Sequence, residues 1–188
     1  MRYASKVNFK PELPYISRAK VVLGEHAKSS VDADAVLIRY YIPEKQQDMI
    51  KTALPKTLQD TTIFICRTTI DLGNFENDLK PHVHTNEQCV LNYYLTTNGE
   101  ETSFFEGAVE PDPNIATDNG NLYYMVNTEK LQKVETFQSN TGESWLLSTR
   151  QPHQVFCKTE QHKVRDMVQI YFMDLSFDEV RKHFEVAQ

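Results

Sequence analysis

The chain has 188 residues, which is the usual length of one domain and enough to bury a hydrophobic core. Its six glycines fall well below the usual ~7% of a protein, and they are scattered singly. The sequence therefore contains neither a glycine-rich dinucleotide fingerprint nor a phosphate-binding P-loop, which excludes the common nucleotide-binding enzymes. No apolar run approaches the ~18 residues that a membrane span needs.

The net charge of −6 argues against a general nucleic-acid-binding protein. Basic residues are concentrated in residues 1–28, a segment that is most simply a solvated surface. The cysteines Cys66, Cys89 and Cys157 are far apart and lie in strand-like runs, which predicts reduced, buried thiols. Because the first residues also lack the apolar segment of a secretory signal, we expect a cytoplasmic protein with no membrane partner.

The first 60 residues mix short strand-like runs with one predicted helix. The run from Ala35 to Tyr41 (AVLIRYY) is typical of a strand. The helix is predicted to begin at Pro43, where a missing N–H is harmless, and to end at Pro55. Its apolar side is formed by Met49, Ile50, Ala53 and Leu54.

From residue 60 onward, short β-rich runs alternate with turn residues such as Asn-Gly and Thr-Gly. Eight runs at this close spacing predict a mainly β fold, a double-stranded β-helix of the jelly-roll type. The predicted strands are 61–69, 88–97, 102–108, 121–127, 133–139, 143–149, 153–159 and 164–175.

A short helix is predicted at the end of the chain. Ser176 and Glu179 form a capping box there. One apolar face follows, formed by Phe177, Val180 and Phe184.

The sequence thus predicts a single domain over 1–188. It comprises an N-terminal α/β extension with one helix (1–60), a jelly-roll core (61–175) and the C-terminal helix (176–188). Between Gly107 and Gly120, twelve residues with little periodicity are equally typical of a rim loop or lid and of a tolerated insertion.

Three histidines are candidate metal ligands. His82 and His84 lie in the segment PHVH, and in an extended chain such residues point to one face, about 7 Å apart at Cα. His153 also follows a proline at the start of a predicted strand, and a jelly roll brings two such strand starts together at one end of facing sheets. Imidazole ligands favour zinc, iron, copper or nickel over magnesium or calcium. The alternative is that His82 and His84 are exposed and that His153 is a hydrogen-bonded core residue.

Arg165, which opens the last long strand, is a candidate anchor for a ligand carboxylate, because a guanidinium binds a carboxylate through two parallel hydrogen bonds. By period-two counting it shares a face with Met167, Gln169 and Tyr171. The opposite face is predicted to be fully apolar, with Val164, Val168, Ile170 and Phe172. Asn92 and Tyr94 share a face of an earlier strand and are candidates for lining the same cavity. An exposed charge at Arg165 and ordinary alternation at the other two are the alternatives.

Two segments resemble the jelly-roll core of the 2-oxoglutarate and iron(II)-dependent oxygenases, in particular its small bacterial and phage-type members. They are PHVHTNEQCVLNYYLTTNGEETSFFEG and GESWLLSTRQPHQVFCKTEQHKVRDMVQIYF, within residues 80–172. The resemblance implies that His82 and His153 bind iron(II) and that Arg165 binds the carboxylate of the cosubstrate 2-oxoglutarate. The cavity that Asn92 and Tyr94 are candidates for lining would then be the cofactor-binding cavity.

The chain departs from this family at His84, which stands where the family has an aspartate. Two histidines and a carboxylate leave three positions open on iron, and the carboxylate offsets part of its charge. The implied site here has three histidines, which suits Fe(II), with zinc and nickel as alternatives. Glu87 is an alternative source of a carboxylate, and Asn86 of a weak carbonyl ligand.

Three functions remain open at this stage. The resemblance implies an oxygenase that hydroxylates an unknown small-molecule or protein substrate. The segment HVHTNE is also similar in part to the cupin metal motif, which gives a cupin-like metal-binding protein without 2-oxoglutarate. The third function is a non-enzymatic jelly-roll binding module. Its exposed aromatic contacts would be Phe104, Phe105, Tyr123 and Tyr124. Nucleic acid is not expected as a partner, and a homodimer stays open.

Overall fold

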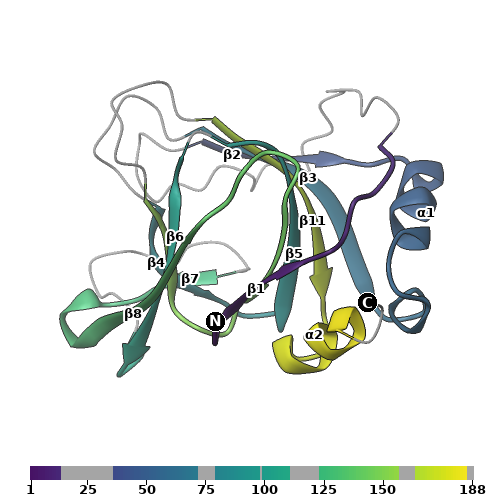
Figure 1. The fold of residues 1–188 in the computed structure, drawn as a ribbon. Helices are drawn as coiled ribbons and strands as arrows, with labels where there is room; N and C mark the ends of the chain where they lie inside the picture. Colours follow the sequence, from purple (N-terminus) through teal and green to yellow (C-terminus); the bar gives the residue numbers. More distant parts are fainter. Residues whose placement is uncertain (14–35, 72–78, 98, 111–122, 157–163, 186–188) are drawn as a thin grey trace.

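A computed structural model of the protein describes residues 1–13, 36–71, 79–97, 99–110, 123–156 and 164–185. These residues form two antiparallel sheets that face each other, with two short helices on the outer side of one sheet (Figure 1). None of the described helices is long and apolar enough to cross a membrane.

The larger sheet contains β1 (Ala4–Val7), β2 (Val36–Tyr41), β3 (Ile63–Asp71), β5 (Cys89–Thr96), β9 (Ser144–Ser148) and β11 (Val164–Phe172). The smaller sheet contains β4 (Leu79–His84), β6 (Glu101–Gly107), β7 (Tyr123–Met125), β8 (Leu131–Gln138) and β10 (His153–Phe156). Their strand orders are β1-β9-β5-β11-β3-β2 and β7-β4-β10-β6-β8. The helices are α1 (Glu44–Thr52) and α2 (Phe177–Glu185), and single 3-10 turns cover Lys56–Leu58 and Thr128–Lys130.

The chain alternates between the two sheets along most of its length. β3, β5, β9 and β11 lie in the larger sheet, and β4, β6, β8 and β10 lie in the smaller one. Eight strands distributed in this way form a jelly roll. β1 and β2 extend the larger sheet at its edges, and β7 lies at an edge of the smaller one. The predicted mainly β jelly roll with a short C-terminal helix is therefore confirmed.

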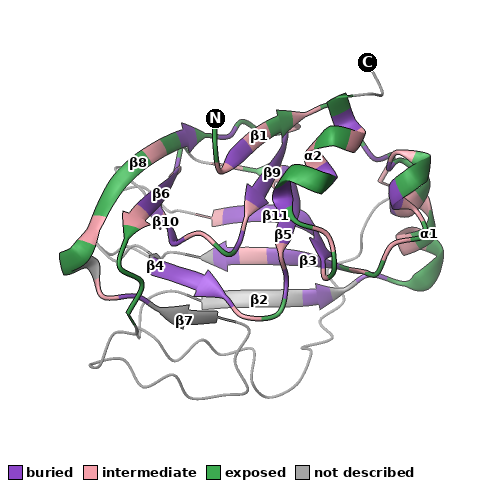
Figure 2. Ribbon diagram, turned by 90° about the horizontal axis from the view of Figure 1, so that it is seen from below, coloured by how far each residue is buried: buried purple, intermediate pink, exposed green. Residues whose placement is uncertain are grey.

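The larger sheet separates two hydrophobic clusters. On β11, Met167 and Tyr171 point between the sheets and pack with residues such as Phe104 of β6. Val168 and Ile170 point to the opposite side, where the two helices cover them (Figure 2). This alternation is the period-two pattern of a strand that is buried on both faces.

The outer face of β11 is not fully apolar, contrary to the prediction. Asp166 is buried on that face, and its carboxylate accepts hydrogen bonds from two nitrogens of Arg67 on β3, with an Nε–Oδ1 distance of 2.9 Å. A buried carboxylate needs such a partner to offset its lost hydration. The partner comes from the adjacent strand, so periodicity within β11 does not reveal it.

Both predicted helices are confirmed. α1 follows Pro43, and it buries Ile50 against the larger sheet. α2 begins with the predicted capping box, in which the Glu179 amide donates to Ser176 Oγ at 3.4 Å and the Ser176 amide donates to the Glu179 carboxylate at 2.8 Å. Its apolar face is buried as expected, through Phe177, Val180 and Phe184.

Two expectations need correction, and others fall outside the described residues. Phe104 and Phe105 are buried rather than exposed, and Phe104 packs in the hydrophobic cluster between the sheets. β4 is an additional strand that the strand-like runs did not include. The side chains of Tyr123 and Tyr124, the thiol Cys157 and most of the predicted loop 107–120 are not described. Cys66 and Cys89 are buried, as predicted.

Glu143 joins the first strand of the chain to β9. Lys6 Nζ on β1 lies 2.6 Å from Glu143 Oε1, and the indole N–H of Trp145 donates to Glu143 Oε2 at 3.0 Å. The side-chain amide of Asn140 donates to Oε1 at 3.1 Å. Burial pushes the pKa of Glu143 upward, but these hydrogen bonds prevail and lower it to about 2.

Because the pKa of Glu143 is depressed in the folded protein, its contribution to stability is complete above the unfolded value near 4.5 and is lost as the pH falls toward 2. We expect Glu143→Gln to lower the free energy of unfolding at pH 7 by about 1–3 kcal/mol and by progressively less below pH 4.5. Urea unfolding across this pH range measures the difference. The matched variant Glu129→Gln removes an exposed carboxylate and should leave the free energy of unfolding unchanged across this pH range. A Glu143→Gln deficit that is constant with pH would contradict the assignment.

Candidate metal centre

The two strands that carry the candidate ligands are neighbours in the smaller sheet. β10 pairs with β4 in antiparallel register, and His153 lies directly opposite His82. His84 lies two residues further along β4 and therefore points to the same face as His82. All three side chains line a cavity between the sheets, so the prediction that they converge on one face is confirmed.

The three imidazoles form one compact, buried group. Their ring centroids are 4.3 Å apart for His82 and His153, 5.1 Å for His84 and His153, and 5.3 Å for His82 and His84. One ligand nitrogen from each ring lies within 4.8 Å of the others. Each residue is less than a tenth exposed, at 4%, 8% and 6% for His82, His84 and His153. The alternative of exposed histidines on β4 is wrong.

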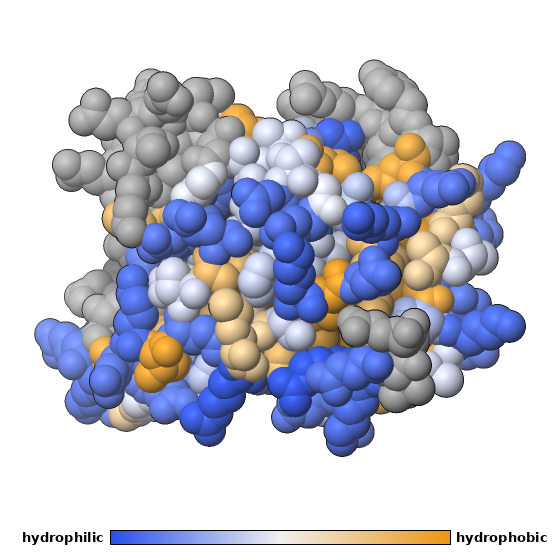
Figure 3. All heavy atoms as spheres, viewed as in Figure 1, coloured by the Kyte–Doolittle hydropathy of each residue, from blue (hydrophilic) through white to orange (hydrophobic). Residues whose placement is uncertain are grey.

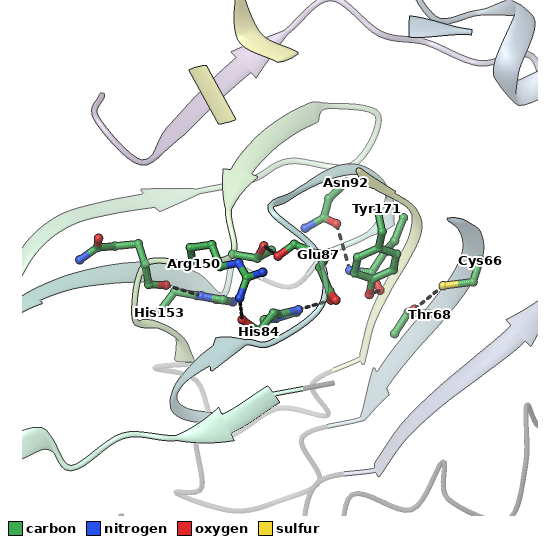
Figure 4. A network of polar contacts seen from close by, with 11 residues as sticks. Cys66, Thr68, His84, Glu87, Asn92, Arg150, His153 and Tyr171 are labelled. Carbon is green, nitrogen blue, oxygen red and sulfur yellow. Dashed lines mark hydrogen bonds and ion pairs between the residues drawn. The ribbon is translucent and has the colours of Figure 1, made fainter. Parts of the chain in front are cut away.

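Hydrogen bonds orient two of the rings. The Nδ1–H of His153 donates to the carbonyl oxygen of Gln151 at 2.9 Å, and Nδ1 of His84 is bonded to a carboxylate oxygen of Glu87 (Figure 4). In both rings Nε2 is then the nitrogen left to coordinate a metal. Burial, followed by the proximity of His82 and His84, holds the pKa of His153 well below its usual value. His153 therefore stays neutral at pH 7, which is the form that binds a metal ion.

The residues that follow β9 fix the position of His84 and Glu87. The backbone N–H of His84 donates to the Thr149 carbonyl at 3.0 Å, and the Thr149 hydroxyl donates to the Glu87 carbonyl at 3.0 Å. Arg150 donates to the His84 carbonyl at 3.3 Å. Glu87 thus acts on the imidazole as a positioning residue. Asn86 is exposed and lies outside the histidine group.

The donor set fits a first-row transition metal. Nitrogen ligands about 2.1 Å from one ion lie about 3.4 Å apart in tetrahedral geometry, and the three ligand nitrogens here lie within 4.8 Å of one another. Three imidazoles offer nitrogen ligands, whereas calcium and magnesium prefer oxygen ligands. Three protein ligands also leave further coordination positions for a small molecule.

The cavity beside the histidines extends along the inner face of the larger sheet. It has about 60 Å³ of space open to the centres of water molecules, enough for more than one water or for part of a small ligand. Arg165 and Asn92 line it, as predicted, together with Gln169 and Tyr171. Tyr94 is not among the residues that line the cavity; it is fully buried beside Arg165 and Asn92, and its hydroxyl accepts a hydrogen bond from each of them. The structure therefore places Arg165 and Asn92 in the cavity wall and Tyr94 next to them.

Glu100 is the polar residue near the cavity that sequence reasoning missed. Its Oε1 lies 3.6 Å from Nε of Arg165, and the two side chains are 3% and 2% exposed. Glu100 lies in the turn before β6, 65 positions from Arg165 in the chain. Because the two residues are so far apart in the chain, no spacing pattern in the sequence predicts that they pair. Glu87 is different, since it lies three residues after His84, within reach of a side chain on the same segment.

No protein-family model matches the chain, and no curated protein matches it. Solved structures of similar fold include hazelnut (Corylus avellana) vicilin, with 13% identity and a TM-score of 0.40 over 80% of this chain and 31% of that chain. A variant of oxalate decarboxylase from Bacillus subtilis has 11% identity and a TM-score of 0.38, over 76% of this chain and 27% of that chain. YcfD from Escherichia coli has 10% identity and a TM-score of 0.42, over 79% of this chain and 36% of that chain. The chain spans about a third of the length of these proteins, and the similarity is one of fold.

Replacement of Glu87 should weaken metal binding without abolishing it. We expect Glu87→Ala to raise the metal dissociation constant by about 10–100-fold, because His84 loses the carboxylate that orients it. Glu87→Gln keeps an acceptor for Nδ1 and should have a smaller effect. Competition with a chromophoric chelator measures both constants. If Glu87→Ala instead lost as much metal affinity as a variant of one of the three histidines, Glu87 would be a direct ligand.

Proposed function

We propose that the protein is a cupin-like metal-binding protein in which His82, His84 and His153 hold a first-row transition metal. The observation that carries this proposal is the convergence of three buried imidazoles from two adjacent strands on one face. When bound, the metal would act as a Lewis acid that polarises a small molecule placed in the adjoining cavity.

The residues around the site have separable tasks in this proposal. The Gln151 carbonyl and the Glu87 carboxylate hold the rings of His153 and His84 so that Nε2 points to the ion. The apolar residues of the cavity, such as Val90 and Leu147, limit the entry of water. The polar side chains of β5 and β11 would bind and orient the ligand.

Metal analysis tests this proposal directly. Protein purified without a histidine tag should bind about one equivalent of Fe(II), Zn(II) or Ni(II), measured by mass spectrometry of the elements after dialysis. His153→Ala should lose stoichiometric binding, because two imidazoles on one strand remain. His183→Ala is the matched control, since His183 lies on α2 against Thr57, away from the site. Less than a tenth of an equivalent in the unaltered protein would refute the proposal.

A second candidate is an Fe(II) and 2-oxoglutarate-dependent oxygenase. The observation in its favour is that Arg165 lies in the wall of the same cavity as the three histidines. Two observations favour the first candidate. The oxygenase family has a carboxylate among its metal ligands, whereas this chain has a third histidine at that position. The oxygenase also needs Arg165 to bind the cosubstrate carboxylate, whereas here the Glu100 carboxylate already lies close to Arg165.

Anaerobic titration separates the two candidates. The oxygenase requires a visible metal-to-keto-acid charge-transfer band when 2-oxoglutarate is added to the Fe(II) protein, and succinate after exposure to air. Arg165→Met should then abolish both signals while metal content persists. We expect the cupin-like protein to give neither signal.

A further inference from the structure

The cavity wall formed by β5 and β11 is polar. Its one formal charge, on Arg165, lies near the carboxylate of Glu100. Among the described residues that line the cavity, Arg165 alone carries a permanent charge. The carboxylate of Glu100 lies 3.6 Å from its Nε, and both groups are almost completely buried. A buried charge that has such a partner gains little from a second anion.

The rest of the Arg165 guanidinium is also engaged within the wall. Nη1 donates to the Thr102 hydroxyl at 3.3 Å, and Nη2 donates to the Tyr94 hydroxyl. The guanidinium carbon lies 4.7 Å from the centre of the Tyr94 ring, in a cation–π contact. A ligand carboxylate at Arg165 would have to displace these contacts and would lie beside Glu100, which repels it in a medium of low dielectric constant.

Two carboxamides, those of Asn92 and Gln169, line this wall together with Arg165. The amide of Gln169 donates to Asn92 Oδ1 at 3.0 Å, and the amide of Asn92 donates to the Tyr94 hydroxyl at 3.3 Å. The Tyr171 hydroxyl donates to Gln169 Oε1 at 2.7 Å, and its ring lies 6.4 Å from that of His84. A carboxamide has two N–H donors and two acceptor sites, so each of these amides has more capacity than this network uses.

We infer that the cavity takes a small monocarboxylate whose other end is a neutral amide or hydroxyl. The carboxylate faces the three-histidine group, and the neutral end is bound by Asn92 and Gln169. A dicarboxylate is disfavoured because its second charge would meet the Arg165–Glu100 pair. This inference rests on the proposed metal centre for the carboxylate end, and on the described polar wall for the neutral end.

Succinamate and succinate are a matched pair of probes, since they have nearly the same shape and differ in whether one end is an amide or a carboxylate. Co(II)-loaded protein is titrated with each, and both the visible Co(II) spectrum and the heat of binding are recorded. Succinamate should bind at least about tenfold more tightly than succinate. Equal affinities, tighter binding of succinate, or no binding of either probe at millimolar concentration would overturn the inference.

Two variants test the cause of the preference. Glu100→Gln leaves the charge of Arg165 without this counter-charge, so the preference for succinamate should shrink or reverse. The double variant Glu100→Gln with Arg165→Met removes both charges and should keep the preference of the unaltered protein. Glu129→Gln removes an exposed carboxylate and is the control for net charge. A preference that is unchanged in Glu100→Gln would show that Glu100 does not set it. If that variant fails to fold, the double variant and the unaltered protein decide.

The metal content of each sample separates this inference from the proposed function. A protein that binds Co(II) but prefers succinate overturns the inference and keeps the metal centre. A protein that binds no metal overturns the proposed function. The heats of binding of the two probes to the metal-free protein then decide the inference, with the same expected preference for succinamate.

Discussion

Antiparallel strands hold directly opposite side chains about 4.5–5.5 Å apart at Cβ, and the pairing of β10 with β4 uses this spacing to place His153 opposite His82. The third ring, His84, follows from the same pairing, because it lies two residues along β4 on the same face. A register shift of one residue would turn His82 and His84 out of the cavity together. The candidate metal centre therefore depends on a backbone register, which the flanking strands β7 and β6 hold on both sides.

Burying three imidazoles side by side costs hydration free energy, and hydrogen bonds from the surrounding structure offset part of this cost. Burial and the neighbouring rings of His82 and His84 hold the pKa of His153 below its usual value. Two Nδ1 atoms have polar partners from the segments that follow β4 and precede β10, at Glu87 and Gln151. These hydrogen bonds orient two of the three rings without the help of an ion.

The sequence was sufficient for the features that depend on local periodicity. Alternation along β11 places Arg165 and Gln169 on the cavity side, and the spacing of His82 and His84 places both rings on one face. β4 itself was not among the predicted strands, because Pro81 and the polar residues of LKPHVH lack the β-branched pattern of a strand.

What the sequence could not supply was the partner of each buried charge. Asp166 meets Arg67 across β3 and β11, and Glu100 approaches Arg165 from a distant turn. These contacts depend on which strands become neighbours, and a single sequence does not determine that. The same limit explains why Phe104 is expected at the surface from the sequence, since its burial depends on the larger sheet covering the inner face of β6. Periodicity assigns a residue to a face, whereas topology decides what covers that face.

The two sheets contribute differently to the cavity. The smaller sheet holds the three histidines on β4 and β10, whereas the larger sheet supplies the polar wall from β5 and β11. Figure 3 shows one outer face of the molecule, on which hydrophilic residues predominate and smaller hydrophobic areas lie among them. Because the ligand nitrogens and the wall residues lie on different strands, a substitution at Asn92 or Gln169 changes the polarity of the wall without moving the register that places the rings. A substitution of Arg165 has a wider effect, because it leaves the buried polar groups of Glu100 and Tyr94 without their partner unless these residues are changed as well. Under the proposed function, metal binding and ligand choice would therefore be separable properties, and the Arg165–Glu100 pair would couple the choice of ligand to the stability of the barrel.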